Sequence, residues 1–251
     1  TMATSIKTAS GDRKIPIVAT TGTASWVDEN AAIPESGVTF EQKTLSAYKL
    51  ATMVKVSEEL LADSAFNLED YMAREFARRF AVAEEAAFCT GNGTGKPTGV
   101  FDSTKGASAG ITAAKTDTFT ANELMDLFYS LRAPYRSKSI WFMNDSTIKI
   151  VRKLKDNNGQ YIWQPALTAG TPDMILGRPY KTSVAAPEAT TGNTAVLFGD
   201  FKYYWIADRK SRTIRRLNEL YAVNGQVAFL GTERLDGCLI LPEAIKGLKM
   251  A

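Results

Sequence analysis

The sequence contains no histidine, and this decides most of the chemistry that its side chains could perform. Histidine-based catalytic triads, histidine-ligated zinc sites and the usual general base at neutral pH are all excluded. Any enzyme of this sequence would have to work with carboxylates, lysine, tyrosine or cysteine alone. The two cysteines, Cys89 and Cys238, lack the clustering of a metal knuckle and are too few for a disulfide framework. They are typical of small buried side chains in a reducing compartment.

Three residues supply the groups for a covalent cross-link. A lysine amine can attack an asparagine amide to form an isopeptide bond if a nearby carboxylate handles the protons and water is excluded. Lys43, Asn224 and Glu233 carry these groups. The alternative, which we favour, is a surface lysine and a turn asparagine in Asn224-Gly225.

Other candidate motifs predict structural roles. In residues 90–97 (TGNGTGKP), Thr90 replaces the first glycine of a phosphate loop and Pro97 replaces its hydroxyl residue. This stretch also follows a predicted helix, at the negative end of the helix dipole, so we expect a turn. Residues 156–159 lack the spacing of a calcium loop, and Glu84-Glu85 diverge as helix neighbours on a solvated face. The sequence therefore predicts no catalytic residue, no metal and no cofactor.

The composition is that of a folded protein. Of the 251 residues, 45% are hydrophobic and 23% are charged, which excludes a wholly disordered chain. No run approaches the roughly 20 apolar residues of a membrane helix, so no membrane contact is predicted. The net charge of +3 is too small for a dedicated nucleic-acid-binding domain.

The first third of the chain predicts extended elements that lack a supporting core. Residues 1–14 are polar and aperiodic and predict an arm ordered by a partner surface, followed by a strand at 15–19. Residues 26–57 predict a long hairpin whose return strand alternates between two faces from Tyr48 to Ser57. Such a hairpin is not stable alone in water. It either folds back on its own domain or lies on a neighbouring subunit.

A long helix is predicted over residues 68–89, with Asn67 as its N-cap and Gly91 at its C-terminal end. Its apolar side chains repeat every four residues, which predicts one buried face. The face is formed by Leu68, Met72, Phe76 and Phe80 and widened by Tyr71, Ala83 and Ala87.

Beyond this helix, helices and strands mix without a regular βαβ rhythm, which predicts an α+β fold. Thr120 and Glu123 form a capping box for a helix that Pro134 stops, and another helix is predicted at 146–155. A turn at 208–211 is expected to join two antiparallel strands. The predicted strands are 139–143, 195–198, 203–206, 213–215, 227–230 and 238–241.

Short motifs follow one another in a specific order and spacing along the chain. They are ASWVDE (24–29), VKVSEELLADS (54–64), EEAAF (84–88), TGNGTGKPTGV (90–100), LGRPY (176–180), FGDF (198–201), IADR (206–209), RLDG (234–237) and PEAIK (242–246). Each is weak alone. Together they resemble the major capsid proteins of tailed bacteriophages, with the Hong Kong 97-type fold, from about residue 15 to residue 250.

The resemblance implies an α+β fold with an N-terminal arm, an extended β-hairpin loop, a peripheral domain with a long spine helix, and an axial domain. It implies an arm and first strand at 1–23, the loop at 24–50, a peripheral domain at 51–110 and 209–235, and an axial domain at 111–208 and 236–251. The loop residues expected to contact a neighbouring subunit are Trp26, Glu29, Pro34, Val38, Phe40, Lys43 and Tyr48. The spine helix is expected to pack through Leu68, Met72, Phe76, Phe80 and Ala87.

The implied function is structural and not enzymatic. Copies of a phage or prophage protein would form pentamers and hexamers of an icosahedral shell that holds double-stranded DNA weakly and without sequence specificity. The expected partners are further copies and the phage's portal, scaffolding protein or maturation protease, with assembly in the bacterial host cytoplasm and a final place in the virion capsid. Two alternatives stay open: an encapsulin-type nanocompartment shell, and a soluble hydrolase that works without histidine.

Overall fold

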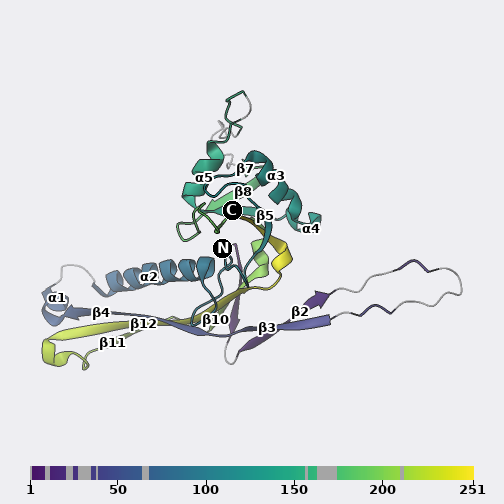
Figure 1. The fold of residues 1–251 in the computed structure, drawn as a ribbon. Helices are drawn as coiled ribbons and strands as arrows, with labels where there is room; N and C mark the ends of the chain where they lie inside the picture. Colours follow the sequence, from purple (N-terminus) through teal and green to yellow (C-terminus); the bar gives the residue numbers. More distant parts are fainter. Residues whose placement is uncertain are drawn as a thin grey trace.

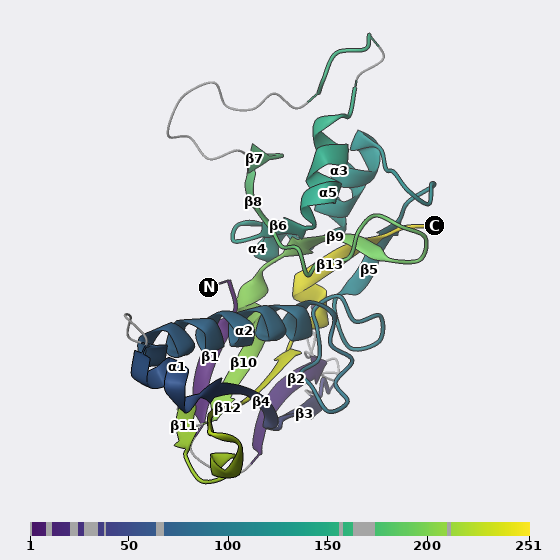
Figure 2. The same cartoon turned by 90° about the vertical axis from the view of Figure 1, so that its left-hand side faces the viewer.

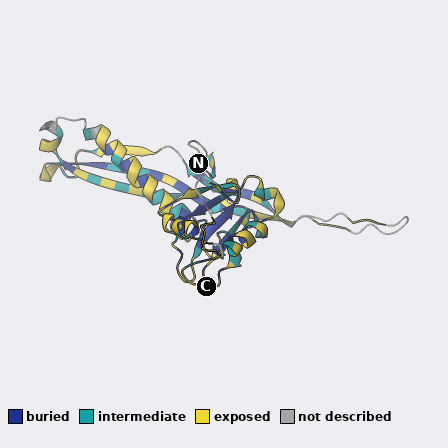
Figure 3. Ribbon diagram, turned by 90° about the horizontal axis from the view of Figure 1, so that it is seen from above, coloured by how far each residue is buried: buried dark blue, intermediate teal, exposed yellow. Residues whose placement is uncertain are grey.

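The computed structural model describes residues 2–8, 12–20, 25–27, 35–37, 39–63, 68–155, 158–162, 174–209 and 212–251. It is an elongated α+β molecule, as predicted, with two sheets and a separate two-stranded ribbon (Figure 1). One sheet extends to one side with the long helix α2 over it, and the ribbon extends to the other side (Figures 1 and 3). Among the described residues, no helix has both the length and the apolar character needed to cross a membrane.

The first sheet is built around one long strand, β12 (Gln226–Leu239). β4 (Tyr48–Ser57) pairs antiparallel with one edge of β12 over ten residue pairs. Along the other edge, β11 (Thr213–Leu217) and then β10 (Tyr204–Arg209) pair antiparallel with β12. β1 (Thr4–Thr8) adds in parallel to β10.

Three sequence predictions are corrected here. The strands expected at 227–230 and 238–241 are one strand, and the strands around 204–209 and 213–217 pair with β12 and not with each other. Residues 4–8 form a strand on the chain's own sheet, although we expected an unpaired arm before residue 15. Edge pairing along a long central strand is a non-local interaction, so local periodicity could not reveal it.

The glycines of β12 explain why the strand continues past residues that resemble turn signals. A Cβ atom at Gly231 would lie 3.0 Å from the ring of Phe80, and one at Gly237 would lie 3.0 Å from the ring of Phe88. Both rings belong to α2 (Leu68–Thr90). Glycine in a strand interior often marks such a close approach, and here it lets α2 lie on the sheet.

α2 confirms the predicted long helix and most of its buried face. Met72, Phe76 and Phe80 are buried against Val56 on β4 and against Val227 and Phe229 on β12. Tyr71, which we expected to widen the apolar face, is 58% exposed. Figure 2 shows α2 crossing the strands of this sheet on one face only. The predicted N-cap, Asn67, lies outside the described residues.

Short elements complete this half of the molecule. α1 (Glu58–Asp63) follows β4 directly, and the 3₁₀ turn η2 (Ala222–Asn224) lies between β11 and β12. η1 (Phe201–Tyr203) leads into β10 from the second sheet, and η3 (Pro242–Ala244) follows β12 on the way back to that sheet.

The second sheet is mixed, in the order β5-β13-β9-β6-β8-β7. Its strands are β5 (Ser108–Thr112), β13 (Ile245–Lys249), β9 (Thr194–Gly199), β6 (Ile140–Met143), β8 (Arg178–Thr182) and β7 (Met174–Ile175). α3 (Ala121–Ser130) and α5 (Asp145–Arg152) pack on it around the fully buried Trp141 and Phe198. The predicted capping box between Thr120 and Glu123 is confirmed. Pro134 lies inside the short α4 (Ala133–Arg136), because α3 ends before it.

The ribbon pairs β2 (Arg13–Thr20) with β3 (Thr39–Leu45), from Arg13↔Leu45 to Thr20↔Thr39. Its base is anchored where Ile15 and Leu45 pack against Ala207 and Ile240. The return strand that we expected to run on past residue 45 is divided into β3 and β4. At that corner the backbone N–H of Ser46 donates to Asp236 Oδ2 at 2.7 Å, so β4 leaves the ribbon and joins β12.

Candidate functional site

The three groups proposed for an isopeptide bond lie apart within one chain. Lys43 Nζ donates to the backbone carbonyl of Leu239 at 3.0 Å, at one end of β12. Asn224 lies in η2, just before the other end of this 14-residue strand. At about 3.3 Å per residue the two ends are more than 40 Å apart, so only a contact between chains could bring Lys43 to Asn224.

Glu233 instead belongs to a partly buried cluster of two acids and one arginine that the sequence did not predict. Arg212 Nε donates to Glu233 Oε2 at 2.6 Å, and another nitrogen of the same guanidinium binds Glu84 on α2. Glu233 is only 4% exposed, and its Oε1 has no hydrogen-bond partner in the described part of the chain. Burial and the neighbouring Glu84 carboxylate raise the pKa of Glu233 to about 7, against the opposing effect of Arg212.

Glu84 and Glu85 diverge as predicted, but neither simply faces solvent. Glu84 points to Arg212, whereas Glu85 Oε1 accepts a hydrogen bond from Ser183 Oγ at 2.6 Å. The two carboxylates therefore tie α2 to two different segments, one before β11 and one after β8. Together with the Glu233 contact, these bonds attach α2 to the first sheet and to the segment that follows β8 of the second sheet.

The glycine-rich stretch is a structural turn, as expected. Asn92 and Thr98 form a backbone bridge, and Thr94 N donates to Asn92 Oδ1 at 3.1 Å. Gly93 and Gly95 have φ values of 73° and 69°, which favour glycine. Thr98 N then donates to the carbonyl of Gly237 at 2.9 Å, and this contact attaches the turn to β12.

The cysteines are not arranged for nucleophilic chemistry. Both are free thiols, and burial raises the pKa of Cys89 and of Cys238 to about 11. A thiolate is the reactive form, and these surroundings oppose it. Within the described ranges, no three Cys, Asp or Glu side chains come together as a metal-binding group. The turn at residues 156–157 lies outside those ranges.

Of the residues expected on the extended loop, those that the structure describes fall into two sets. Trp26 and Phe40 are 104% and 69% exposed and contact little of their own chain. Lys43 and Tyr48 are partly buried, and the Tyr48 hydroxyl donates to the carbonyl of Gly93 at 3.1 Å. Glu29, Pro34 and Val38 lie outside the described residues. Of the predicted loop residues that the structure describes, Trp26 and Phe40 therefore expose the most side-chain surface.

Comparison with known proteins assigns this architecture to a family. The family model described as "Phage capsid family" matches residues 1–250. The chain belongs to the phage capsid family. This capsid-family chain is also 26% identical to the major capsid protein of Klebsiella oxytoca phage phiKO2, over 79% of its own length and 48% of that relative. It thus spans about half the length of the curated relative that it matches.

Solved structures confirm the Hong Kong 97-type fold of this capsid-family chain. The capsid of a native GTA particle, computed with C5 symmetry, matches with a TM-score of 0.91 and 31% identity, covering 100% of this chain and 88% of the other. A structure from Gordonia phage Cozz matches with a TM-score of 0.71 at 15% identity, covering 100% and 85%, and shows the fold alone. The predicted resemblance to tailed-phage capsid proteins is confirmed.

Proposed function

We propose that this chain is a major capsid subunit of a tailed phage, prophage or phage-like particle. Copies associate into pentamers and hexamers, and these close into an icosahedral shell around double-stranded DNA. Membership of the phage capsid family supports this role, as does the likeness to the GTA capsid. The role is structural and requires no catalytic group.

The observation that carries the proposal is the unsupported ribbon. Among the described residues, the strands β2 and β3 pair only with each other, and the side chains of Trp26 and Phe40 are exposed. A two-stranded hairpin is at best marginally stable in water, and exposed aromatic side chains are typical of contact surfaces. A neighbouring copy in a shell would cover this surface and supply the missing contacts.

We propose the peripheral and axial domains as the two sheets with their helices. The peripheral domain holds the first sheet with α1 and α2, and the axial domain holds the second sheet with α3, α4 and α5. Relative to the sequence-based limits, β10 and the end of β12 move to the peripheral domain, because they pair within its sheet. The ribbon keeps its own role as the inter-subunit loop.

Further partners follow from the same proposal. The portal, a scaffolding protein and a maturation protease would meet the shell during assembly in the host cytoplasm, before the protein takes its place in the virion. Packaged DNA would be contacted weakly, since the net charge is only +3.

Negative-stain electron microscopy of the purified full chain, with size-exclusion chromatography over a range of concentrations, tests this function. We expect rings or closed shells whose fraction rises with concentration. A chain that stays monomeric at every concentration and ionic strength contradicts the proposal.

A further inference from the structure

The helix α5 has a buried apolar face and an exposed cationic end. Ile148 and Val151 are buried in the core of the second sheet, where Figure 2 shows α5 beside α3. The last turn of the helix and the residues just after it carry positive charge on the surface. Four exposed side chains form this basic end of α5: Lys149, Arg152, Lys153 and Lys155.

The positive charge of the chain is concentrated around this helix. Residues 132–182 contain nine lysine and arginine side chains but only three acids, a net charge of +6. The other 200 residues contain 21 cations and 24 acids, a net charge of −3. The chain is therefore slightly acidic except in one region, and the whole-chain value of +3 conceals a local positive surface that can attract an anionic partner.

The cations are not neutralised within the described part of the chain. No carboxylate there forms an ion pair with Lys149, Lys153 or Lys155, and this includes Asp145, one helical turn before Lys149. The helix dipole favours cations in the last turn, which is the structural explanation for such residues. It does not explain why Lys149 and Lys153 are four residues apart, since like charges at this spacing destabilise a helix. An external anion would relieve this repulsion.

Two tyrosine side chains lie among these cations. Lys155 Nζ is 5.0 Å from the centre of the Tyr161 ring, and Tyr161 is 54% exposed. Arg152 donates a hydrogen bond to the Tyr180 hydroxyl at 3.3 Å, which ties the end of α5 to β8. Lysine, arginine and tyrosine are among the side chains that commonly bind the phosphate oxygens of DNA. The surface thus combines positive charge with hydrogen-bond donors.

A basic amphipathic helix can also bind a membrane surface, but only by inserting its apolar face. In α5 that face is already covered, since Ile148 and Val151 are 7% and 2% exposed and pack in the core of the second sheet. Only the charged side of the helix is available to another molecule. This favours a densely charged polyanion over a lipid surface.

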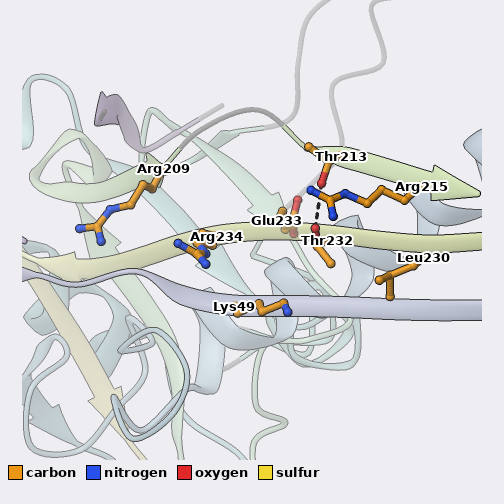
Figure 4. Close-up of a pocket in the computed structure, with 8 residues that line it drawn as sticks. All are labelled: Lys49, Arg209, Thr213, Arg215, Leu230, Thr232, Glu233 and Arg234. Atoms are coloured by element: carbon orange, nitrogen blue, oxygen red, sulfur yellow. Dashed lines mark hydrogen bonds between the residues drawn. The ribbon is translucent and has the colours of Figure 1, made fainter. Parts of the chain in front are cut away.

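A second cation-rich surface, on the first sheet, differs in its charge. Figure 4 shows Lys49, Arg215 and Arg234 among the residues that line a cleft of about 300 Å³. Glu233 also lines this cleft, and it is bound to Arg212. An acid within the lining offsets part of the positive charge there, so the basic end of α5 is the stronger candidate for binding a polyanion.

We propose that the basic end of α5 is the surface through which this chain contacts duplex DNA, by its phosphates and without reading the base sequence. Each subunit supplies only a few phosphate contacts, so one contact is weak, and many copies in a shell act together. This inference rests on the proposed shell function and names the surface that meets the packaged DNA. It requires the basic end of α5 to face the interior of the shell.

Fluorescence anisotropy of the full chain with a labelled DNA duplex tests the contact. In Lys149→Gln/Lys153→Gln, the affinity at about 50 mM salt should fall about tenfold or more. The slope of log affinity against log salt concentration should become shallower by about 2, since each lost phosphate contact removes about 0.9. Both side chains are exposed, so the urea midpoint of the variant should stay close to the wild-type value.

Two variants serve as controls for this measurement. Lys149→Arg/Lys153→Arg keeps both charges and should bind as the wild type does. Lys96→Gln/Lys115→Gln removes the same charge from two exposed positions outside residues 132–182 and should keep the wild-type slope. An equal loss of DNA binding in this second control would show that only the total charge matters, and would overturn the proposal.

The orientation of α5 in the shell is tested by cysteine labelling. Lys149→Cys places a thiol on the exposed side of the helix, and the two natural thiols are buried or half-buried. A bulky polymer maleimide should react with the new thiol in free subunits but not in closed shells. Rapid labelling of closed shells would place the basic end on the outside, where it would bind an acidic protein and not DNA, and would overturn the proposal.

The remaining outcomes separate this inference from the proposed function. If Lys149→Gln/Lys153→Gln binds duplex DNA as tightly as the wild type, the inference is wrong, while the shell function stands because assembly is scored separately by electron microscopy. A wild-type chain that assembles but binds no duplex at low salt leads to the same conclusion. A wild-type chain that never assembles contradicts the shell function itself.

Discussion

Glu233 on β12 and Glu84 on α2 share one arginine, because the guanidinium of Arg212 binds an oxygen of each carboxylate. The long helix is thus joined to the central strand by two acids and one base. One arginine has to balance two carboxylates, of which Glu233 is buried, and Glu233 Oε1 lacks a hydrogen-bond partner among the described residues. The contact between α2 and the sheet should therefore depend on pH.

The first prediction concerns this pH dependence. The pKa of Glu233 is raised to about 7 in the folded chain, above its ordinary value of 4.5. The folded state then holds the proton more tightly, so stability from this group is complete below pH 4.5 and is lost as pH rises through 7. Glu233→Gln removes this loss. From pH 5 to pH 8 the variant should gain up to about 3 kcal/mol over the wild type in urea unfolding.

Glu219→Gln serves as the control for that measurement, since Glu219 is exposed and lies outside the cluster. Its unfolding free energy should follow the wild type at both pH values. An equal pH dependence of Glu233→Gln and the wild type would show that Glu233 does not titrate in this range.

The second prediction concerns the ribbon. Thr20 and Thr39 are cross-strand partners, so residues 21–38 can be replaced by the two-residue turn Asn-Gly. The shortened chain keeps the packing of Ile15 and Leu45 and should unfold at the same urea concentration as the wild type. It should form few rings or shells by electron microscopy, because the segment that carries the exposed Trp26 is gone. Normal shells from this variant would refute the role of the loop in assembly.

The third prediction tests the packing of α2. Phe76 is 1% exposed and packs against strands β4 and β12. Phe76→Ala should lower the free energy of unfolding by about 3–5 kcal/mol, since it leaves a cavity under the helix. Tyr71→Ala on the same helix, where the side chain is 58% exposed, should change it by no more than about 0.5 kcal/mol. Similar losses in both variants would mean that α2 does not bury the face described.

The fourth prediction concerns the close approach of α2 to β12. A Cβ atom at Gly237 would lie 2.7 Å from the Tyr204 hydroxyl and 3.0 Å from the Phe88 ring. That hydroxyl donates to the carbonyl of Thr98 at 2.6 Å in a buried site. Gly237→Ala should therefore cost about 1–3 kcal/mol in thermal or urea unfolding. Gly37→Ala, with no atom within 4 Å of the new Cβ, is the matched control and should be close to neutral.

Local patterns predicted the elements that depend on near neighbours in sequence. The spacing of four residues between Met72, Phe76 and Phe80 predicted α2. The Thr120–Glu123 capping box predicted the start of α3. The alternation from Tyr48 to Ser57 predicted which side chains of β4 face the core. These features arise from helix and strand periods and from hydrogen bonds within one turn, so they are readable without a fold.

Pairing between distant segments was not predicted. Residues 227–239 resemble two strands because glycine and charged residues interrupt the apolar runs, yet β4 pairs with them in register for ten residues. The Glu84–Arg212–Glu233 cluster joins residues that are up to 149 positions apart, and no local signal marks it. The alternation of β4 predicted that Lys49 lies on the face opposite the core, but its cross-strand partner Arg234 became known only from the register.

The sequence alone determined three things about this protein. The absence of histidine excluded histidine-based catalysis and histidine-ligated metal sites. The order of the motifs gave the family resemblance, and the spacing of the apolar residues predicted the main helices. The tertiary structure alone decided where β12 runs, which charges meet across it and which direction the ribbon takes from its anchor. The reason is physical: helices and caps are stabilised by neighbours within a few residues, whereas sheet register and buried ion clusters depend on contacts between segments that only the folded chain brings together.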